Sequence, residues 1–300
     1  MFEHGALLRG DGTLPGLLRL RAQERGQQVA LREKVQGVWR GRTWADYYRD
    51  ARRVALGFMK LGLQRGDRIV IAAEDVPEWF YADLGAQMLG VQVVGIYPTN
   101  PWPEVQYIAS HCQAKVAITG DQEQTDKVLD AMKEGAGLPH LEHIFCVDMK
   151  GLRRYAPGKP GSFEHLMALG DQLVQEDPLA EQRLDQSVDR LLPDDVNILV
   201  YTSGTTGPPK GAMLTHRNFI FAAYSYAAAR QMVGKRFESV CYLPLCHVAE
   251  RGYSTVLHLL TGGCVNFAES VDTVSANIRE IAPTFFLGVP RIWEKLQQNF

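Results

Sequence analysis

The segment that most constrains this chain is the run Tyr201-Thr-Ser-Gly-Thr-Thr-Gly-Pro-Pro-Lys-Gly211. It follows a short apolar stretch, residues 197–201, which predicts a buried strand, and Thr215 is placed to cap a helix that starts just after it. Glycines let a backbone approach an anion closely with its N–H groups turned inward, and hydroxyl side chains add further donors. The run therefore predicts a polyphosphate-binding loop between a strand and a helix.

The loop gathers four hydroxyls, three glycines and one lysine within ten residues. They are Thr202, Ser203, Thr205 and Thr206, then Gly204, Gly207 and Gly211, and finally Lys210, which supplies a point charge. An ordinary surface turn, the alternative for a cluster of this composition, does not need such a set. A Walker A loop is also disfavoured, because that motif requires a serine or threonine after its lysine, and Gly211 stands there instead.

Composition limits the classes of protein to which the chain can belong. Three hundred residues with 46% hydrophobic content can bury a large core, and the length corresponds to about two domain-sized units. The net charge of -2 gives no electrostatic footprint for nucleic acid. The five cysteines are widely spaced, without a C-x-x-C pair or a histidine at zinc-finger spacing, so we expect reduced thiols and no metal site.

The hydropathy pattern predicts neither a targeting segment nor a membrane span. Residues 1–10 contain Glu3 and His4 and lack a long apolar run, and no stretch of eighteen apolar residues follows. We therefore expect a soluble, cytoplasmic protein, with a peripheral membrane contact left open. The sequence does not indicate an oligomeric state.

Apolar periodicity alternates between strand and helix patterns, which predicts an α/β fold. Strand patterns occur at 68–73, 91–97, 115–119, 240–243, 264–268 and 284–289, and helical patterns at 44–59 after Thr43, from Pro77 to near Gly90, from Pro103, and at 249–260 and 274–281. Aromatic and methionine side chains such as Trp44, Trp79 and Met88 are expected to be core residues of these helices.

The predicted division has two parts. A first α/β subdomain spans 1–195, and its last part, 150–195, is a polar connecting region in which only 163–174 has a helical pattern. A second subdomain, with its own sheet and the phosphate-binding loop, begins at 196 and continues to 300.

At its glycine-rich loop the chain resembles the adenylate-forming enzymes, whose signature reads closely as Thr202–Gly211 does. Three further stretches resemble the long-chain fatty acyl-CoA synthetase branch, including its bubblegum-type members: Ile96-Tyr-Pro-Thr-Asn100, Tyr242-Leu-Pro-Leu-Cys-His-Val-Ala-Glu-Arg251 and Pro283-Thr-Phe-Phe-Leu-Gly-Val-Pro-Arg-Ile-Trp-Glu-Lys295. The resemblance extends from about Thr13 to the end of the chain. It implies part of the large N-terminal domain of such an enzyme, built as two βα-layered sheet subdomains with the second incomplete.

The resemblance implies ATP-dependent activation of a long-chain fatty acid. The carboxylate would attack the α-phosphorus of ATP, bound with Mg²⁺, to give acyl-AMP and pyrophosphate, and the thiol of coenzyme A would then displace AMP. This chemistry asks a protein chiefly for positioning and charge stabilisation. Ser203, Thr205, Thr206 and Lys210 are expected to hold the β- and γ-phosphates, and Thr202 either joins them or is structural.

The candidate acyl-site residues come later in the chain. His247 follows an apolar strand and Pro244. A lone histidine beside apolar residues is commonly a hydrogen-bonded core residue, whereas the resemblance makes it a catalytic residue at the carboxylate end of the acyl pocket, close to the α-phosphate. A second group of candidate residues follows, and this group forms either a tight strand end or a wall of the acyl pocket. The residues of that group are Phe285, Phe286, Gly288 and Val289.

Several stretches that the family carries later do not occur in these 300 residues. They are the Tyr-Gly-x-Thr-Glu stretch, the aspartate of a Thr-Gly-Asp context, and the C-terminal lid domain with its adenylation lysine. If the chain were the entire polypeptide, we would expect severely impaired or absent adenylation. The leading hypothesis is the first part of a long-chain fatty acid–CoA ligase. The alternatives are a catalytically inactive remnant that binds nucleotide, acyl chains or a partner, and a ligase for another carboxylic acid.

Overall fold

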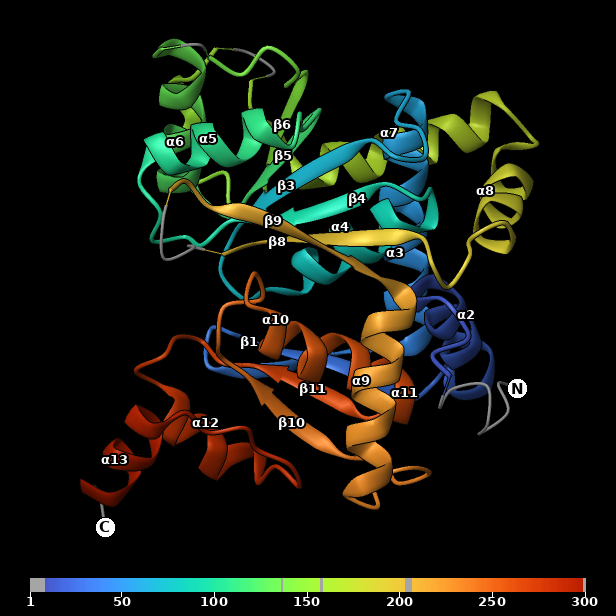
Figure 1. Ribbon diagram of the computed structural model, residues 1–300, viewed down its shortest axis with the longest axis vertical. Helices are drawn as coiled ribbons and strands as arrows, with labels where there is room; N and C mark the ends of the chain where they lie inside the picture. Colours follow the sequence, from blue (N-terminus) through green and yellow to red (C-terminus); the bar gives the residue numbers. More distant parts are fainter. Residues whose placement is uncertain (1–8, 136, 157–158, 203–206, 299–300) are drawn as a thin grey trace.

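The computed structural model describes residues 9–135, 137–156, 159–202 and 207–298. The described strands form two sheets, one of seven strands in the order β7-β6-β5-β3-β4-β8-β9 and one of four in the order β10-β11-β1-β2. In Figure 1 the seven-stranded sheet lies above the four-stranded sheet, with helices around and between them. The predicted α/β architecture with two sheets is therefore confirmed.

The seven-stranded sheet is mostly parallel. Its members are β3 (Arg68–Ala72), β4 (Gln92–Gly95), β5 (Val116–Thr119), β6 (His143–Cys146), β7 (Gly161–Ser162), β8 (Val196–Thr202) and β9 (Lys210–Thr215). Every pair in this sheet is parallel except β8 with β9. The interior strand β5, with the sequence VAIT, is buried at all its positions, as expected where helices cover both faces of a parallel sheet.

The four-stranded sheet joins distant parts of the chain. Its members are β1 (Val29–Val35), β2 (Val38–Thr43), β10 (Glu238–Cys241) and β11 (Cys264–Phe267). β1 pairs in parallel with β11 and antiparallel with β2. The expectation that a second sheet begins at residue 196 is wrong, because β8 pairs with β4 in the first sheet while β1 and β2 belong to the second. Backbone pairing, which apolar periodicity does not reveal, decides this assignment.

Helices occupy most of the remaining described chain. They are α2 (Leu14–Arg25), α3 (Trp44–Lys60), α4 (Pro77–Met88), α5 (Trp102–His111), α6 (Gln122–Lys133), the 3₁₀-helix η1 (Leu152–Arg154), α7 (Phe163–Glu176), α8 (Ala180–Asp189), α9 (His216–Ala229), α10 (Val248–Glu250), the π-helix η2 (Arg251–Leu257), α11 (His258–Thr261), α12 (Val274–Ile281) and α13 (Pro290–Gln298). Thr43 and Thr215 both form capping boxes, with Asp46 and Asn218 respectively, which confirms the two predicted helix starts.

Two local expectations are wrong. Helix α8 forms inside the connecting region, because Ala180, Leu184 and Val188 recur every four residues and are buried along one face. Residues 284–289 form no strand. Thr284 N and Phe285 N both donate to Glu238 O at one end of the segment. At the other end the hydroxyl of Tyr242 donates to Leu287 O at 2.7 Å and accepts from Val289 N at 3.3 Å.

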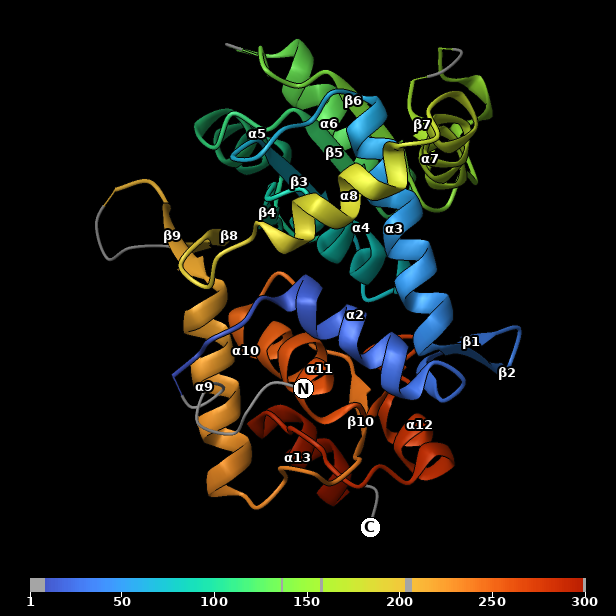
Figure 2. The same ribbon diagram turned by 90° about the vertical axis from the view of Figure 1, so that its right-hand side faces the viewer.

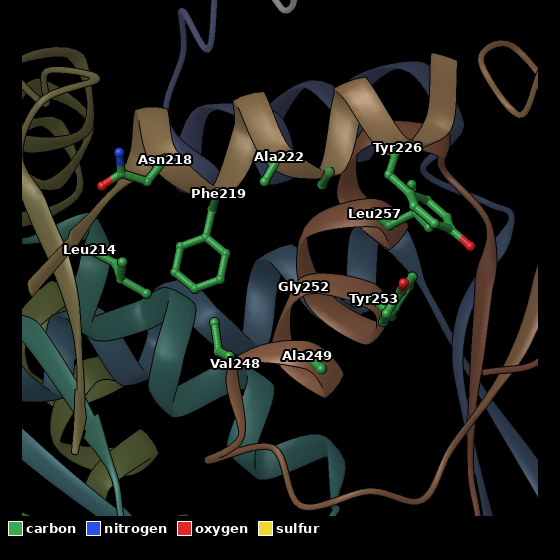
Figure 3. A pocket seen from close by; sticks show the side chains of 11 residues that line it. Leu214, Asn218, Phe219, Ala222, Tyr226, Val248, Ala249, Gly252, Tyr253 and Leu257 are labelled. Carbon is green, nitrogen blue, oxygen red and sulfur yellow. The ribbon is translucent and has the colours of Figure 1, made fainter. Parts of the chain in front are cut away.

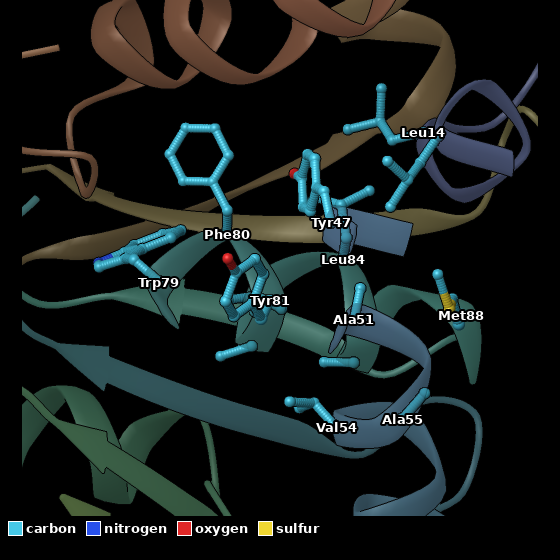
Figure 4. Packing of buried hydrophobic residues seen from close by; sticks show 14 of the residues in the cluster. Leu14, Tyr47, Ala51, Val54, Ala55, Trp79, Phe80, Tyr81, Leu84 and Met88 are labelled. Carbon is cyan, nitrogen blue, oxygen red and sulfur yellow. The ribbon is translucent and has the colours of Figure 1, made fainter. Parts of the chain in front are cut away.

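The main core lies around α3 and α4, where buried aromatic side chains from both helices meet (Figure 4). Trp44, Trp79 and Met88 are at most 1% exposed, which confirms their predicted place in the core. Figure 2 shows β9 leading into α9, which descends from the seven-stranded sheet alongside α10 and α11. Among the helices described, none has the length and apolar character required to cross a membrane.

A candidate phosphate loop beside an apolar pocket

The glycine-rich loop closes a hairpin. Thr202, the last residue of β8, pairs with Lys210, the first residue of β9. The expected order of strand, loop and helix is therefore corrected, because Lys210 and Gly211 lie in a second strand and α9 begins only at His216. Antiparallel pairing with β8 satisfies the backbone of this segment before the capping residue Thr215 starts the helix.

The described loop residues have the exposure that an anion site needs. The side chains of Thr202 and Lys210 are exposed at the two ends of the loop. Gly207 has φ +85°, and a Cβ added there would have no atom within 4 Å among the residues that the structure describes. Ser203, Gly204, Thr205 and Thr206 lie outside the described residues.

Helix α5 holds both ends of the loop through aromatic side chains. Tyr107 donates a hydrogen bond from its hydroxyl to Pro209 O at 2.9 Å, and His111 Nδ1 lies 2.6 Å from the hydroxyl of Tyr201. Gly211 makes room for this arrangement, because a Cβ there would lie 3.1 Å from Cζ of Tyr201. We call Tyr107, His111 and Tyr201 the α5 brace. Sequence reasoning missed it, since the only local signal is two aromatic side chains spaced four residues apart on a helix.

An apolar pocket of about 400 Å³ opens between α9 and the segment formed by α10 and η2 (Figure 3). Its lining residues are Leu214, Asn218, Phe219, Ala222, Ala223, Tyr226, Val248, Ala249, Gly252, Tyr253 and Leu257. In Figure 3 the ring of Phe219 projects from α9 toward Val248, and Tyr226 and Tyr253 lie together at the opposite end. Aliphatic and aromatic walls of this kind suit the hydrocarbon part of a ligand.

His247 precedes the first two pocket residues of α10. Its Nδ1 accepts a hydrogen bond from Ala249 N at 3.1 Å, so the imidazole caps the helix. The side chain is exposed, which excludes the alternative that it is a core residue.

None of the four residues expected in segment 285–289 lines the pocket. Phe285 comes nearest, because its ring lies 6.3 Å from that of Tyr226 and 5.6 Å from that of Tyr253, behind the tyrosine end of the pocket. Phe286, Gly288 and Val289 belong to a separate cluster. Phe286 stacks on Tyr242, Gly288 abuts Trp293, and Val289 N donates to the hydroxyl of Tyr242.

Buried polar side chains lie behind the pocket. Arg251, which is 1% exposed, forms an ion pair with Asp83 of α4, and its guanidinium lies 4.6 Å from the ring of Trp79. Glu250 accepts a hydrogen bond from Ser254, and burial raises the pKa of its carboxyl to about 7. Within the described part of the chain, no group of three or more His, Cys, Asp or Glu side chains could hold a metal ion.

Comparison with known proteins agrees with this geometry. Residues 18–300 match the family described as AMP-binding enzyme. The chain belongs to the AMP-binding enzyme family. The resemblance to adenylate-forming enzymes that its loop indicated is thereby confirmed.

The relatives are similar over almost the whole chain. Long-chain-fatty-acid–CoA ligase ACSBG2 of Xenopus laevis is 34% identical over 296 residues, 96% of this chain and 38% of that protein. Long-chain-fatty-acid–CoA ligase ACSBG1 of Rattus norvegicus is 36% identical over 280 residues, 91% and 37% of the respective chains. The chain therefore spans well under half the length of these relatives, both of which are named as ligases of the branch that its motifs resemble.

A solved structure shows the same fold. The putative long-chain-fatty-acid CoA ligase of Rhodopseudomonas palustris superposes with a TM-score of 0.74 at 20% identity, covering 96% of this chain and 66% of that one.

Proposed function

We propose that this chain supplies the nucleotide and acyl sites of an ATP-dependent long-chain fatty acid–CoA ligase. The observation that carries the proposal is the position of the apolar pocket. Helix α9 lines this pocket, and it follows directly after β9, the strand that begins where the phosphate loop ends. A fatty acid in the pocket and a nucleotide at the loop would thus be held by one continuous piece of chain. The names of the relatives support the same substrate class.

In the proposed reaction the fatty acid carboxylate attacks the α-phosphorus of ATP, pyrophosphate leaves, and the thiol of coenzyme A later displaces AMP to form the thioester. Lys210 and Thr202, exposed at the ends of the loop, would neutralise and orient the β- and γ-phosphates together with Ser203, Thr205 and Thr206. Mg²⁺ would arrive with the nucleotide and neutralise phosphate charge, since such ions are held largely by substrate phosphates and water.

His247 would orient the carboxylate. Its ring is exposed at the start of α10, directly before Val248 and Ala249 of the pocket wall. An acyl chain inserted among these walls would carry its polar end toward the exposed imidazole, whose Nε2 is left to contact the carboxylate because Nδ1 accepts from Ala249 N.

Pocket depth would set the preferred chain length. Each buried methylene contributes about 0.8 kcal/mol, so eight additional methylenes would contribute about 6 kcal/mol before ordering costs. The tyrosine pair Tyr226 and Tyr253, backed by Phe285, would form the far wall that decides this depth.

A substitution in the pocket tests the proposal. Ala222→Phe would place a ring inside the pocket, whereas Ala229→Phe puts the same ring on an exposed position of the same helix outside it. We expect Ala222→Phe to weaken palmitate binding at least about tenfold, because a ring that fills the apolar site excludes the ligand sterically. ATP affinity should stay within about twofold of the wild-type value. Ala229→Phe should change neither affinity. Equal palmitate affinity in the two variants would contradict the proposed acyl site.

A second candidate function is binding of nucleotide and acyl chains without turnover. Acid-dependent exchange of pyrophosphate into ATP would separate the two functions, because a binding protein shows saturable binding and no exchange. Repeating the exchange with other carboxylic acids, with and without coenzyme A, would distinguish a ligase for a different acid.

We also infer a reducing cellular location such as the cytoplasm. All five cysteines are buried as free thiols, which fits a compartment in which thiols stay reduced. Sedimentation of the chain with lipid vesicles would measure any peripheral membrane contact.

A further inference from the structure

A line of buried polar side chains connects the wall of the pocket to the base of the phosphate-loop hairpin. Arg251, the first residue of η2, donates from Nε to Asp83 Oδ2 at 3.2 Å and also donates from Nη2 to Oδ1. One turn along α4, Gln87 donates from Nε2 to Asp83 Oδ1 at 2.6 Å and accepts at Oε1 from Asn197 Nδ2 at 3.0 Å. All four side chains are at most 2% exposed. We call Arg251, Asp83, Gln87 and Asn197 the relay.

The relay ends at an irregularity in the hairpin. Val196 pairs with Thr215 and Ile198 pairs with Leu214, so Asn197 is an extra residue in β8. Bulges of this kind redirect a side chain and are frequent beside active sites. Here the bulge sets the register that brings Thr202 opposite Lys210 at the loop. The bulge also lies across from Thr215, the residue that caps α9.

The other end of the relay lies in an unusual helix. Residues Arg251–Leu257 form a π-helix, a conformation that is rare in proteins and is often found at functional sites. Gly252, Tyr253 and Leu257 of this helix line the pocket, while Arg251 points into the protein toward Asp83 and Trp79. The relay therefore joins one pocket wall, η2, to the hairpin that begins the other wall, α9.

Both ends of the relay retain an unpaired atom. Arg251 Nη1 and Asn197 Oδ1 are buried and have no hydrogen-bond partner among the residues that the structure describes. Unpaired buried polar atoms are uncommon in native proteins and call for a specific reason. Each end of the relay therefore has the capacity for one further hydrogen bond.

We propose that the relay is a set of positioning residues that couples the apolar pocket to the phosphate loop, so that a bound acyl chain changes the affinity for ATP and bound ATP changes the affinity for the acyl chain. This inference rests on the proposed function. Filling the pocket fixes the spacing of η2 and α9, and the relay transmits that spacing to the bulge that aligns the loop. Coupling between two binding sites is reciprocal by thermodynamic necessity.

The test measures the dissociation constant of MgATP for the 300-residue chain with and without saturating palmitate, and takes the ratio as the coupling factor. In the double variant Gln87→Met/Asn197→Leu both partners of their shared hydrogen bond become apolar groups of similar shape. The bond from Gln87 to Asp83 is lost as well, and Asp83 keeps its two bonds from Arg251. The control Thr119→Val/Thr125→Val removes a hydrogen bond of 2.7 Å between two fully buried hydroxyls in β5 and α6, away from the pocket.

We expect a coupling factor of about five or more in the wild-type chain, as is typical of coupled sites. It should fall to within about twofold of unity in the relay variant and stay unchanged in the control. ATP affinity without palmitate should change by less than about threefold in both variants. If the relay were merely structural, its loss would weaken ATP binding in the absence of palmitate as well. Arg251→Lys, which keeps the charge but loses the two-pronged contact with Asp83, should reduce the factor as well and replaces the double variant if the latter does not fold.

Two results would overturn the inference. One is a wild-type chain that binds both ligands without coupling, and the other is a folded relay variant that keeps the wild-type factor; both leave the proposed function intact. A wild-type chain that binds neither MgATP nor palmitate would instead refute the proposed function, and the relay with it.

Discussion

Lys210 illustrates how much depends on single side chains at the proposed nucleotide site. It is exposed at the start of β9, directly opposite Thr202. We expect Lys210→Met to raise the dissociation constant for ATP about tenfold or more, since hydrogen bonds to charged groups contribute about 1.5–3 kcal/mol. Palmitate binding should not change. Lys235→Met, at an exposed lysine beyond α9, is the matched control, and equal ATP affinity of the two variants would rule out the assigned role.

Glu250 makes the stability of the chain depend on pH in a predictable direction. Burial raises the pKa of this carboxyl from 4.5 to about 7, so between these values the folded chain keeps a proton that the unfolded chain has released. The free energy of unfolding therefore falls as pH rises through this window, by about 1.4 kcal/mol per pH unit at most. Glu250→Gln removes the titration and should give a flatter profile between pH 5 and pH 7.5, measured by urea unfolding.

The difference between the two profiles reports Glu250 together with Asp75, whose pKa is raised by burial and by the charge of Glu250. Burial also raises the pKa of Glu78 to about 7 and lowers that of His216 to about 4, but both residues are present in the two proteins and their contributions cancel. Parallel profiles would show that Glu250 is ionised in the folded chain.

At the scale of elements, helix α5 determines how firmly the loop is held. Tyr107→Phe removes the hydrogen bond to Pro209 and keeps the ring that packs against His111 and Tyr201. One lost hydrogen bond corresponds to about 1 kcal/mol, so ATP affinity should fall about fivefold with unchanged palmitate affinity. The control is Tyr155→Phe, which removes a hydroxyl that donates to Asp126 and does not belong to the α5 brace. Isothermal titration calorimetry compares the variants, and a similar effect in both would mean that the brace has no specific role.

The elements also separate what the sequence can predict from what it cannot. Thr43 and Thr215 were predictable as helix caps, because a capping box is a local pattern of side chain and backbone. The α5 brace and the relay were not, because each joins residues that are about 90 or more positions apart, such as His111 with Tyr201 or Asn197 with Gln87. The loop was predicted from its donors alone, and the strand that follows it was missed because Lys210 and Gly211 carry no strand pattern.

For the whole molecule, the pairing of strands matters more than their order along the chain. β1 lies between β11 and β2, so the lower sheet in Figure 1 needs both ends of the chain. β8 and β9 extend the upper sheet beyond β4. The division at residue 195 that composition suggested therefore separates paired strands in both sheets. Composition could not reveal this, because hydropathy and polarity report local burial and do not report which strands pair.

This topology predicts that the chain folds as one unit. Fragments of residues 1–195 and 196–300 would each leave strand edges unpaired: β4 would lose β8, and β1 would lose β11. Unpaired edges and divided cores do not support stable folding, so we expect each fragment alone to show little tertiary structure by near-ultraviolet circular dichroism and to aggregate. The 300-residue chain should unfold in urea in a single transition seen alike by circular dichroism and tryptophan fluorescence. If the 1–195 fragment unfolds cooperatively on its own with the midpoint of the full chain, the two sheets are energetically independent, and the shared strands contribute little to holding the loop and the pocket together.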